Sequence, residues 1–112
     1  MSEKYNCVVR IRVEKNDGES RHAFGHGIAS LMSGVQEYHS LNKAAKKMGM
    51  SYSKAWTSIK EAEEELGFSL VNRDGQRGST LTDKGKHFLE MFKLAEAAAQ
   101  ATSNSILKNF DI

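Results

Sequence analysis

Two short amphipathic segments separated by three residues constrain the fold of this chain more than any other feature. Residues 41–48 carry apolar side chains at helical spacing, and Ser40 precedes them as an N-cap. After a turn at Gly49, Ser51 caps a second helical pattern in the same way. Ala45 provides the small side chain needed where two helices cross steeply, and Gly49 permits the tight turn four residues later. The pattern predicts a helix-turn-helix.

The second helix of this pair has one apolar and one polar face. It runs to about Leu66, where Gly67 ends it by adopting the left-handed conformation. Tyr52 and Trp56 lie between the faces, and we expect Trp56 to pack rather than to stack on bases. The apolar face comprises Ala55, Ile59, Ala62 and Leu66, and the opposite face Ser53, Lys54, Thr57, Lys60 and Glu61. This outer face is polar, partly basic and free to enter a major groove.

The residues before this pair predict a hairpin and a helix. Apolar and polar residues alternate over residues 5–14, which is the period of a half-buried strand. Asp17-Gly18 tolerates the positive φ angles of a tight turn, so residues 20–24 are expected to return as a second strand. From Ile28 to Tyr38 the apolar spacing changes to three and four, which predicts a helix.

The residues after the pair predict a wing and a long helix. Residues 68–71 and 79–81 read as two short strands around a glycine-containing loop, and Thr82 caps the final helix. The expected fold is mostly α with a small β part, a winged helix-turn-helix. Its parts would be an N-terminal β-hairpin, a three-helix core, a β wing and a long C-terminal helix.

Length and composition fit one small domain. The chain has 112 residues, so we expect a single domain over 1–112 in which 82–110 form the long helix. No stretch is long enough to cross a bilayer, and the N-terminus lacks the apolar core of a signal peptide. The single cysteine, Cys7, cannot form an internal disulfide and is expected to be a buried thiol. The expected compartment is a reducing cytoplasm.

Positive charge is concentrated in the middle of the chain. Residues 40–87 carry nine Lys/Arg against six Asp/Glu, although the net charge of the whole chain is only +2. Four of the six acidic residues form one local cluster, which we predict to be a solvated helix face: Glu61, Glu63, Glu64 and Glu65. This distribution favours a polyanionic partner.

The sequence indicates neither metal binding nor catalysis. There is no cysteine pair, and no recognised ligand spacing is formed by His22, His26, His39 and His87. No nucleophile motif, phosphate loop or carboxylate pair in a pocket-forming context is present. We therefore expect no metal, no cofactor and no enzymatic activity.

The run from Ser40 to Trp56, with its Gly-Met-Ser-Tyr-x-x-Ala-Trp core, resembles the DNA-binding domain of ModE-type molybdate-responsive regulators. Residues 66–73 and 81–85 resemble the segments beside the wing in that family and in LysR-type regulators, and residues 24–27 resemble the entry to its first helix. The similarity covers roughly residues 5–94. The wing tip, residues 74–79, is shorter and has only two glycines. The resemblance implies a DNA-binding module without the molybdate-binding domain of full-length members.

The candidate DNA contacts divide by the part of DNA that they would reach. Ser53, Lys54 and Thr57 are expected to read base edges, because lysine donates to guanine and threonine offers a methyl group to thymine. The other candidate contacts, mainly to the DNA backbone, are Lys43, Lys46, Lys47, Ser51, Tyr52, Lys60, Arg73, Gln76 and Arg77. Considered alone, the three lysines of residues 41–48 would form an ordinary solvated face, and the helix-turn-helix context favours phosphate binding.

The long last helix carries an apolar stripe more extended than one small domain can bury. In the resembling families this helix pairs two DNA-binding domains, which implies a homodimer. Such a dimer presents two recognition helices to half-sites about 34 Å apart or a multiple of that. The expected dimerisation residues are Ile28, Leu31, Phe88, Phe92, Ala95, Ala99 and Ile106.

The leading prediction is a sequence-specific transcriptional regulator of the ModE/LysR winged-helix class that binds a two-fold operator in double-stranded DNA. Winged helices also bind proteins, so an adaptor that uses Tyr52, Trp56 and the wing is the alternative. A small enzyme is a third possibility, disfavoured by the lack of a predicted metal site or pocket. The sequence indicates no operator, no direction of regulation and no small-molecule effector, molybdate included.

Overall fold

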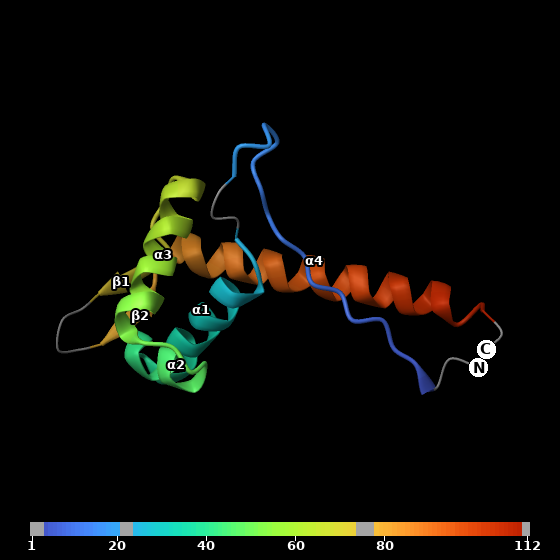
Figure 1. The fold of residues 1–112 in the computed structure, drawn as a ribbon, viewed down its shortest axis with the longest axis horizontal. Coiled ribbons are helices and arrows are strands. Elements are labelled where there is room, and N and C mark those ends of the chain that lie inside the picture. Colours follow the sequence, from blue (N-terminus) through green and yellow to red (C-terminus); the bar gives the residue numbers. More distant parts are fainter. Residues whose placement is uncertain (1–3, 21–23, 74–77, 111–112) are drawn as a thin grey trace.

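The computed structural model describes residues 4–20, 24–73 and 78–110. Figure 1 shows the shorter helices and the small sheet gathered together, with a long helix running out of this group. The described elements are α1 (His26–Tyr38), α2 (Leu41–Lys47), α3 (Tyr52–Leu66), β1 (Val71–Arg73), β2 (Ser79–Leu81) and α4 (Asp83–Leu107). They confirm the prediction of a mostly helical winged helix-turn-helix with a long last helix.

Side-chain caps start three of the helices where the sequence predicts. Ser40, Ser51 and Thr82 each accept a hydrogen bond from the backbone N–H three residues later, at 3.1, 3.1 and 2.9 Å. Each bond satisfies one of the free N–H groups of a first helical turn and stabilises the helix by about 1 kcal/mol. Gly49 and Gly67 follow α2 and α3 with φ angles of 70° and 81°. These residues set the boundaries of the helix pair.

The core forms around α1, which contacts α2, α3, α4 and β2. Ala45 is fully buried, as its predicted place in the helix crossing requires. The closest approach involves Gly34 of α1, because a Cβ atom there would lie 2.5 Å from the Cβ of Ala44. The largest fully buried side chains are Phe24, Phe92, Leu31, Met32, Leu41, Ile59, Leu70, Leu89 and Val35.

The predicted N-terminal β-hairpin is described only in part, because residues 21–23 of its expected second strand lie outside the described residues. The turn forms, with Gly18 at φ 75° and its N–H donating to the carbonyl of Lys15 at 3.3 Å. Among the described residues the two arms form one antiparallel bridge, between Val13 and Phe24. Residues 7–11, which we call the strap, run along α4 instead (Figure 1).

The strap is held to α4 by main-chain donors and side-chain acceptors. Three alternate N–H groups donate to side-chain oxygens of α4 at 2.6, 3.1 and 3.1 Å, pairing Cys7 with Asn104, Val9 with Gln100 and Ile11 with Glu96. Two residues of a strand advance about 6.6 Å and four residues of a helix about 6.0 Å, so the spacings agree over three bonds. These bonds pair a part of the extended segment that lies beyond the Val13–Phe24 bridge.

The first wing strand begins at Val71 rather than at residue 68. The carboxylate of Glu63 accepts the N–H groups of Leu70 and Val71 at 2.6 and 3.3 Å, so these donors are satisfied by α3. Phe68 packs edge-on against Phe88, with ring centres 5.6 Å apart. The two strands pair antiparallel, and they form a short wing beside α3.

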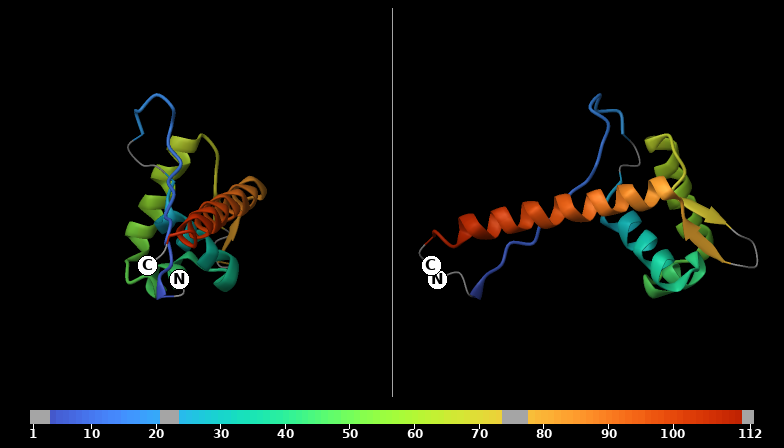
Figure 2. Two further views of the ribbon diagram at one scale, coloured as in Figure 1. Left: turned by 90° about the vertical axis from the view of Figure 1, so that its right-hand side faces the viewer. Right: turned by 180° about the vertical axis from the view of Figure 1, so that it is seen from behind.

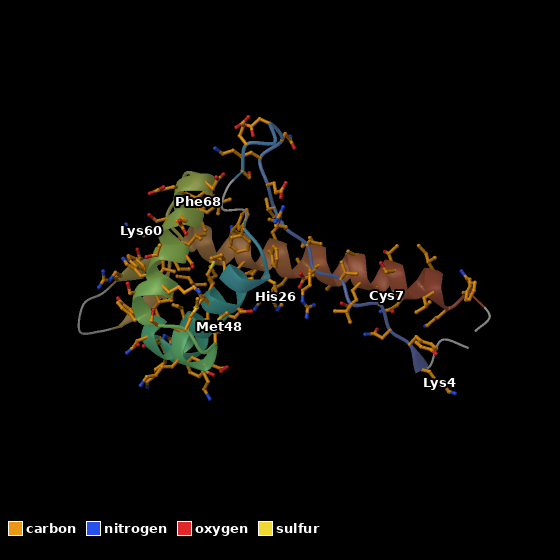
Figure 3. The ribbon with its side chains drawn as sticks, in the orientation of Figure 1. Lys4, Cys7, His26, Met48, Lys60 and Phe68 are labelled. Carbon is orange, nitrogen blue, oxygen red and sulfur yellow. The ribbon has the colours of Figure 1, made fainter. Side chains whose placement is uncertain are left out.

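The molecule measures 55 × 33 × 23 Å, because α4 continues beyond the core (Figure 2). The strap follows the far part of α4, and Cys7 lies alongside that helix in Figure 3. None of the described helices has the length and apolarity needed to cross a membrane.

Candidate nucleic-acid interface

The outer face of α3 is the centre of the candidate interface. Ala55, Ile59 and Ala62 are buried, which turns the opposite side of the helix to solvent. Lys60, labelled in Figure 3, stands on that outer side. The exposed side chains of this surface are those of Ser51, the N-cap of α3, and of Tyr52, Ser53, Lys54, Thr57 and Lys60. The structure thus brings together the six residues that the sequence singled out on this helix.

The three lysines of α2 lie on the neighbouring helix. Lys43, Lys46 and Lys47 are exposed, while Leu41 and Ala44 of the same helix are buried. Lys46 and Lys47 occupy the last turn, where positive charge complements the partial negative charge of the helix C-terminus. Since α2 packs directly on α3, these lysines extend the positive charge beyond α3 itself.

Arg73, the last residue of β1, joins the wing to α3. Its guanidinium carbon lies 4.9 Å from the ring centre of Trp56 and 5.7 Å from that of Tyr52. The Nζ atom of Lys60 lies 5.3 Å from the same Trp56 ring. Trp56 packs against the core, as predicted, and its half-buried ring also contacts two cations. Sequence reasoning missed this second role, because no local spacing relates residues 56 and 73.

The base of the wing is also fixed to α1. The N–H of Ser79 donates to the carbonyl of His39 at 3.0 Å. Gly78 has a φ of 94°, and a Cβ atom there would lie 2.2 Å from that carbonyl oxygen. A hollow of about 380 Å³ between the wing and the helix starts is lined by Ser40, Leu41, Asn42, Tyr52, Arg73, Gly78 and Ser79. Gln76 and Arg77, the other candidate wing contacts, lie outside the described residues.

The acidic end of α3 is only partly a solvated face. The Glu63 carboxylate accepts hydrogen bonds from the backbone N–H groups of Leu70 and Val71, at the start of β1. Glu65 is 15% exposed in its side chain, and its Oε2 lies 3.8 Å from the Nζ of Lys15. The prediction of four solvated glutamates therefore needs correction at Glu63 and Glu65. Their packing comes from segments distant in sequence, which the helical period of α3 does not reveal.

The predicted dimerisation residues divide between the core and the surface. Leu31 and Phe92 are each 1% exposed, and the ring of Phe88 lies 4.8 Å from that of Phe24. These three side chains pack within the protomer, which corrects the predicted stripe. The remaining members are half-buried at Ile28 and Ala99 and exposed at Ala95 and Ile106.

An exposed apolar face of α4 was missed. Met91 and Leu94 have 43% and 72% of their surface exposed, and Ala95 and Ala98 share their side of the helix. At about 100° per residue this side lies roughly opposite the strap acceptor Gln100. A helical wheel centred away from Phe92 would have identified it.

The described residues contain no cluster of three or more His, Cys, Asp or Glu side chains that could hold a metal ion. His26 is placed 3.7 Å from Glu96, measured between Nδ1 and Oε1. His22 lies outside the described part of the chain. Cys7, the first residue of the strap, is half-buried rather than fully buried.

Comparisons with known proteins agree with this geometry. The family described as "Bacterial regulatory helix-turn-helix protein, lysR family" matches residues 31–86, from α1 to the start of α4. A chain from "Crystal structure of CbnR_DBD-DNA complex" matches with 26% identity and a TM-score of 0.61, over 75% of this chain and 97% of that one. No curated protein matches the sequence.

Proposed function

Because the chain belongs to the lysR family of bacterial regulatory helix-turn-helix proteins, we propose that it binds double-stranded DNA and regulates transcription. The observation that carries this proposal is the free outer face of α3, which is polar and includes Lys54 and Lys60. The lysines of α2 and Arg73 of the wing flank this face. The similarity to a chain solved in a complex with DNA supports the same use of the fold.

In the proposed complex α3 enters the major groove. An α-helix fits this groove, and the first turns of the second helix of a helix-turn-helix reach the base edges. Ser53, Lys54 and Thr57 lie in those turns and are exposed. Lys54 is suited to donate to guanine O6 and N7, and Thr57 to contact a thymine methyl group. These three residues would carry sequence specificity.

The remaining contacts would be made to the DNA backbone. Each phosphate contact contributes about 0.9 to the slope of log K against log salt concentration. The residues proposed for these contacts are Lys43, Lys46, Lys47, Ser51, Tyr52, Lys60 and Arg73, together with Gln76 and Arg77 from the wing. Occupancy of a promoter would then affect transcription without any chemical step or cofactor.

A homodimer formed through α4 would bind a two-fold operator. The support for this part is the exposed apolar face of Met91, Leu94, Ala95 and Ala98, which faces away from the protomer's own strap. Small side chains beside larger ones allow two helices to approach closely. We propose residues 1–112 as one winged-helix domain, with residues 82–110, which contain α4, as its dimerisation segment.

Within the family we propose the ModE type. Its support is the Gly-Met-Ser-Tyr-x-x-Ala-Trp run, each of whose distinctive residues has a structural role here. Ser51 caps α3, Ala55 is fully buried, and Tyr52 and Trp56 contact Arg73. The proposal includes no effector.

Selection of bound sequences from a random duplex DNA pool at near-physiological salt tests the function. A palindrome with two half-sites supports a dimeric regulator, and its spacing reports the dimer geometry. Lys54→Ala is expected to relax specificity at one position of each half-site, whereas the control Lys93→Ala, on exposed α4, leaves the selected sequence unchanged. Enrichment of no DNA would overturn the proposal and leave the protein adaptor.

A further inference from the structure

The Trp56 ring contacts cationic side chains from two separate elements. Lys60 belongs to α3 and lies one helical turn after Trp56, so its contact at 5.3 Å is local. Arg73 belongs to β1 and reaches the same ring at 4.9 Å from outside the helix. The chain contains a single tryptophan, so one side chain makes both contacts. The ring is therefore a link between α3 and the wing.

Tyr52 adds a second ring to this link. It is the first residue of α3 and stands one turn before Trp56, so both rings lie on the same side of the helix. Arg73 lies within 5.7 Å of the Tyr52 ring centre as well. A guanidinium group over aromatic faces is attracted to the ring electrons and leaves N–H donors at its edge for another partner. The two rings thus restrict Arg73 without consuming its donors.

The surroundings show why this restriction matters. Arg73 is exposed, no salt bridge to it is found among the described residues, and it lines the hollow at the base of the wing. Glu63 of α3 accepts the N–H of Leu70, and Glu65 lies 3.8 Å from Lys15. A free arginine in such a position would sample many rotamers, and holding it in one costs conformational entropy on binding.

We propose that Trp56 and Tyr52 are positioning residues that hold Arg73, and through Trp56 also Lys60, in place for DNA phosphates. The inference rests on the proposed DNA binding and deepens it. Trp56 itself needs no contact with DNA. Its role is to hold Arg73 of the wing and Lys60 of α3 in fixed positions before DNA binds. Less side-chain conformational entropy is then lost on binding.

A double-mutant cycle on DNA affinity tests the inference. An exposed cation–π contact contributes about 0.5–1 kcal/mol, so Trp56→Leu is expected to weaken binding about two- to fivefold. In an Arg73→Ala background the same change should have less effect, because the main side chain that it positions is gone. Trp56→Phe keeps an aromatic face and should restore most of the affinity. The salt slope should fall by about 0.9 in Trp56→Leu if the Arg73 phosphate contact is lost.

Controls separate positioning from folding. Trp56 packs against the core, so every variant is compared with wild type by circular dichroism and thermal unfolding before binding is measured. Tyr5→Leu, a substitution of an exposed aromatic residue outside the candidate interface, is the matched control and should leave the affinity and the salt slope unchanged. Equal effects of Trp56→Leu in the wild-type and Arg73→Ala backgrounds, in folded proteins, would overturn the inference and leave DNA binding intact. A wild-type protein without salt-sensitive DNA binding would overturn both.

Discussion

Replacement of Gly34 by alanine should destabilise the protein, although alanine is the better helix former. Alanine favours a helix interior over glycine by about 1 kcal/mol. The added Cβ would lie 2.5 Å from the Cβ and 3.1 Å from the Cα of Ala44. Neither atom can move away by a change of rotamer, so α1 and α2 must separate. Overpacking a core costs roughly 1–3 kcal/mol, and we expect a cost at the upper end of this range. We expect a net loss of about 1–2 kcal/mol in the free energy of unfolding.

Gly27→Ala is the matched control, because Gly27 lies in the same helix and a Cβ atom there has nothing within 4 Å. It should raise stability by about 0.5–1 kcal/mol. Urea unfolding at one fixed protomer concentration measures both free energies, and thermal unfolding should show Gly34→Ala about 4–8 °C below wild type. The helix pair would be strained by the first variant and left unchanged by the second.

Removal of the opposing methyl group provides an internal test. Ala44→Gly alone should be destabilising, because it removes buried surface and adds a glycine to α2. Combined with Gly34→Ala it should recover part of the loss, giving a favourable coupling of about 1 kcal/mol or more. Equal stabilities of Gly34→Ala and Gly27→Ala, or additive effects in the double variant, would refute the steric reasoning.

Three further changes test the strap, the dimer face and the α3 cap. Gln100→Ala removes the acceptor of the Val9 N–H and should lower the free energy of unfolding by about 1 kcal/mol. It should also speed hydrogen exchange at the Val9 amide, and unchanged exchange would contradict the strap geometry. Leu94→Glu should shift sedimentation toward monomer while Lys93→Glu does not, and a persistent dimer would refute the proposed face. Ser51→Ala should lower the free energy of unfolding by about 1 kcal/mol in urea titrations, whereas no loss would show that the cap is dispensable.

The parts of the fold that sequence reasoning predicted are those governed by local rules. Ser40, Ser51 and Thr82 cap helices because their hydroxyls reach N–H groups only three residues away. The burial of Ala55 and Ile59 follows from the helical period alone. The exposed face of α3, and with it most of the candidate site, was predictable for this reason.

The errors occur where a segment had a choice of partner. Alternation over residues 5–14 correctly indicated a half-buried extended segment, but it does not reveal that residues 7–11 would bond to spaced acceptors on α4. Phe88 and Phe92 correctly indicated an apolar side of α4, yet the period does not reveal that Phe24 would cover them. The contact of Arg73 with Trp56 likewise joins elements that no spacing rule relates.

The strap also sets an order of events while the chain is being made. Cys7 and its acceptor Asn104 are 97 positions apart, so at about 5–20 residues per second the strap emerges some 5–20 s before the oxygen that receives its first N–H. During this interval an extended apolar edge has no native partner on α4, which is the state in which strands attach to other chains. Exposed Arg10 and Arg12 interrupt that edge with positive charge and oppose such attachment until α4 is complete.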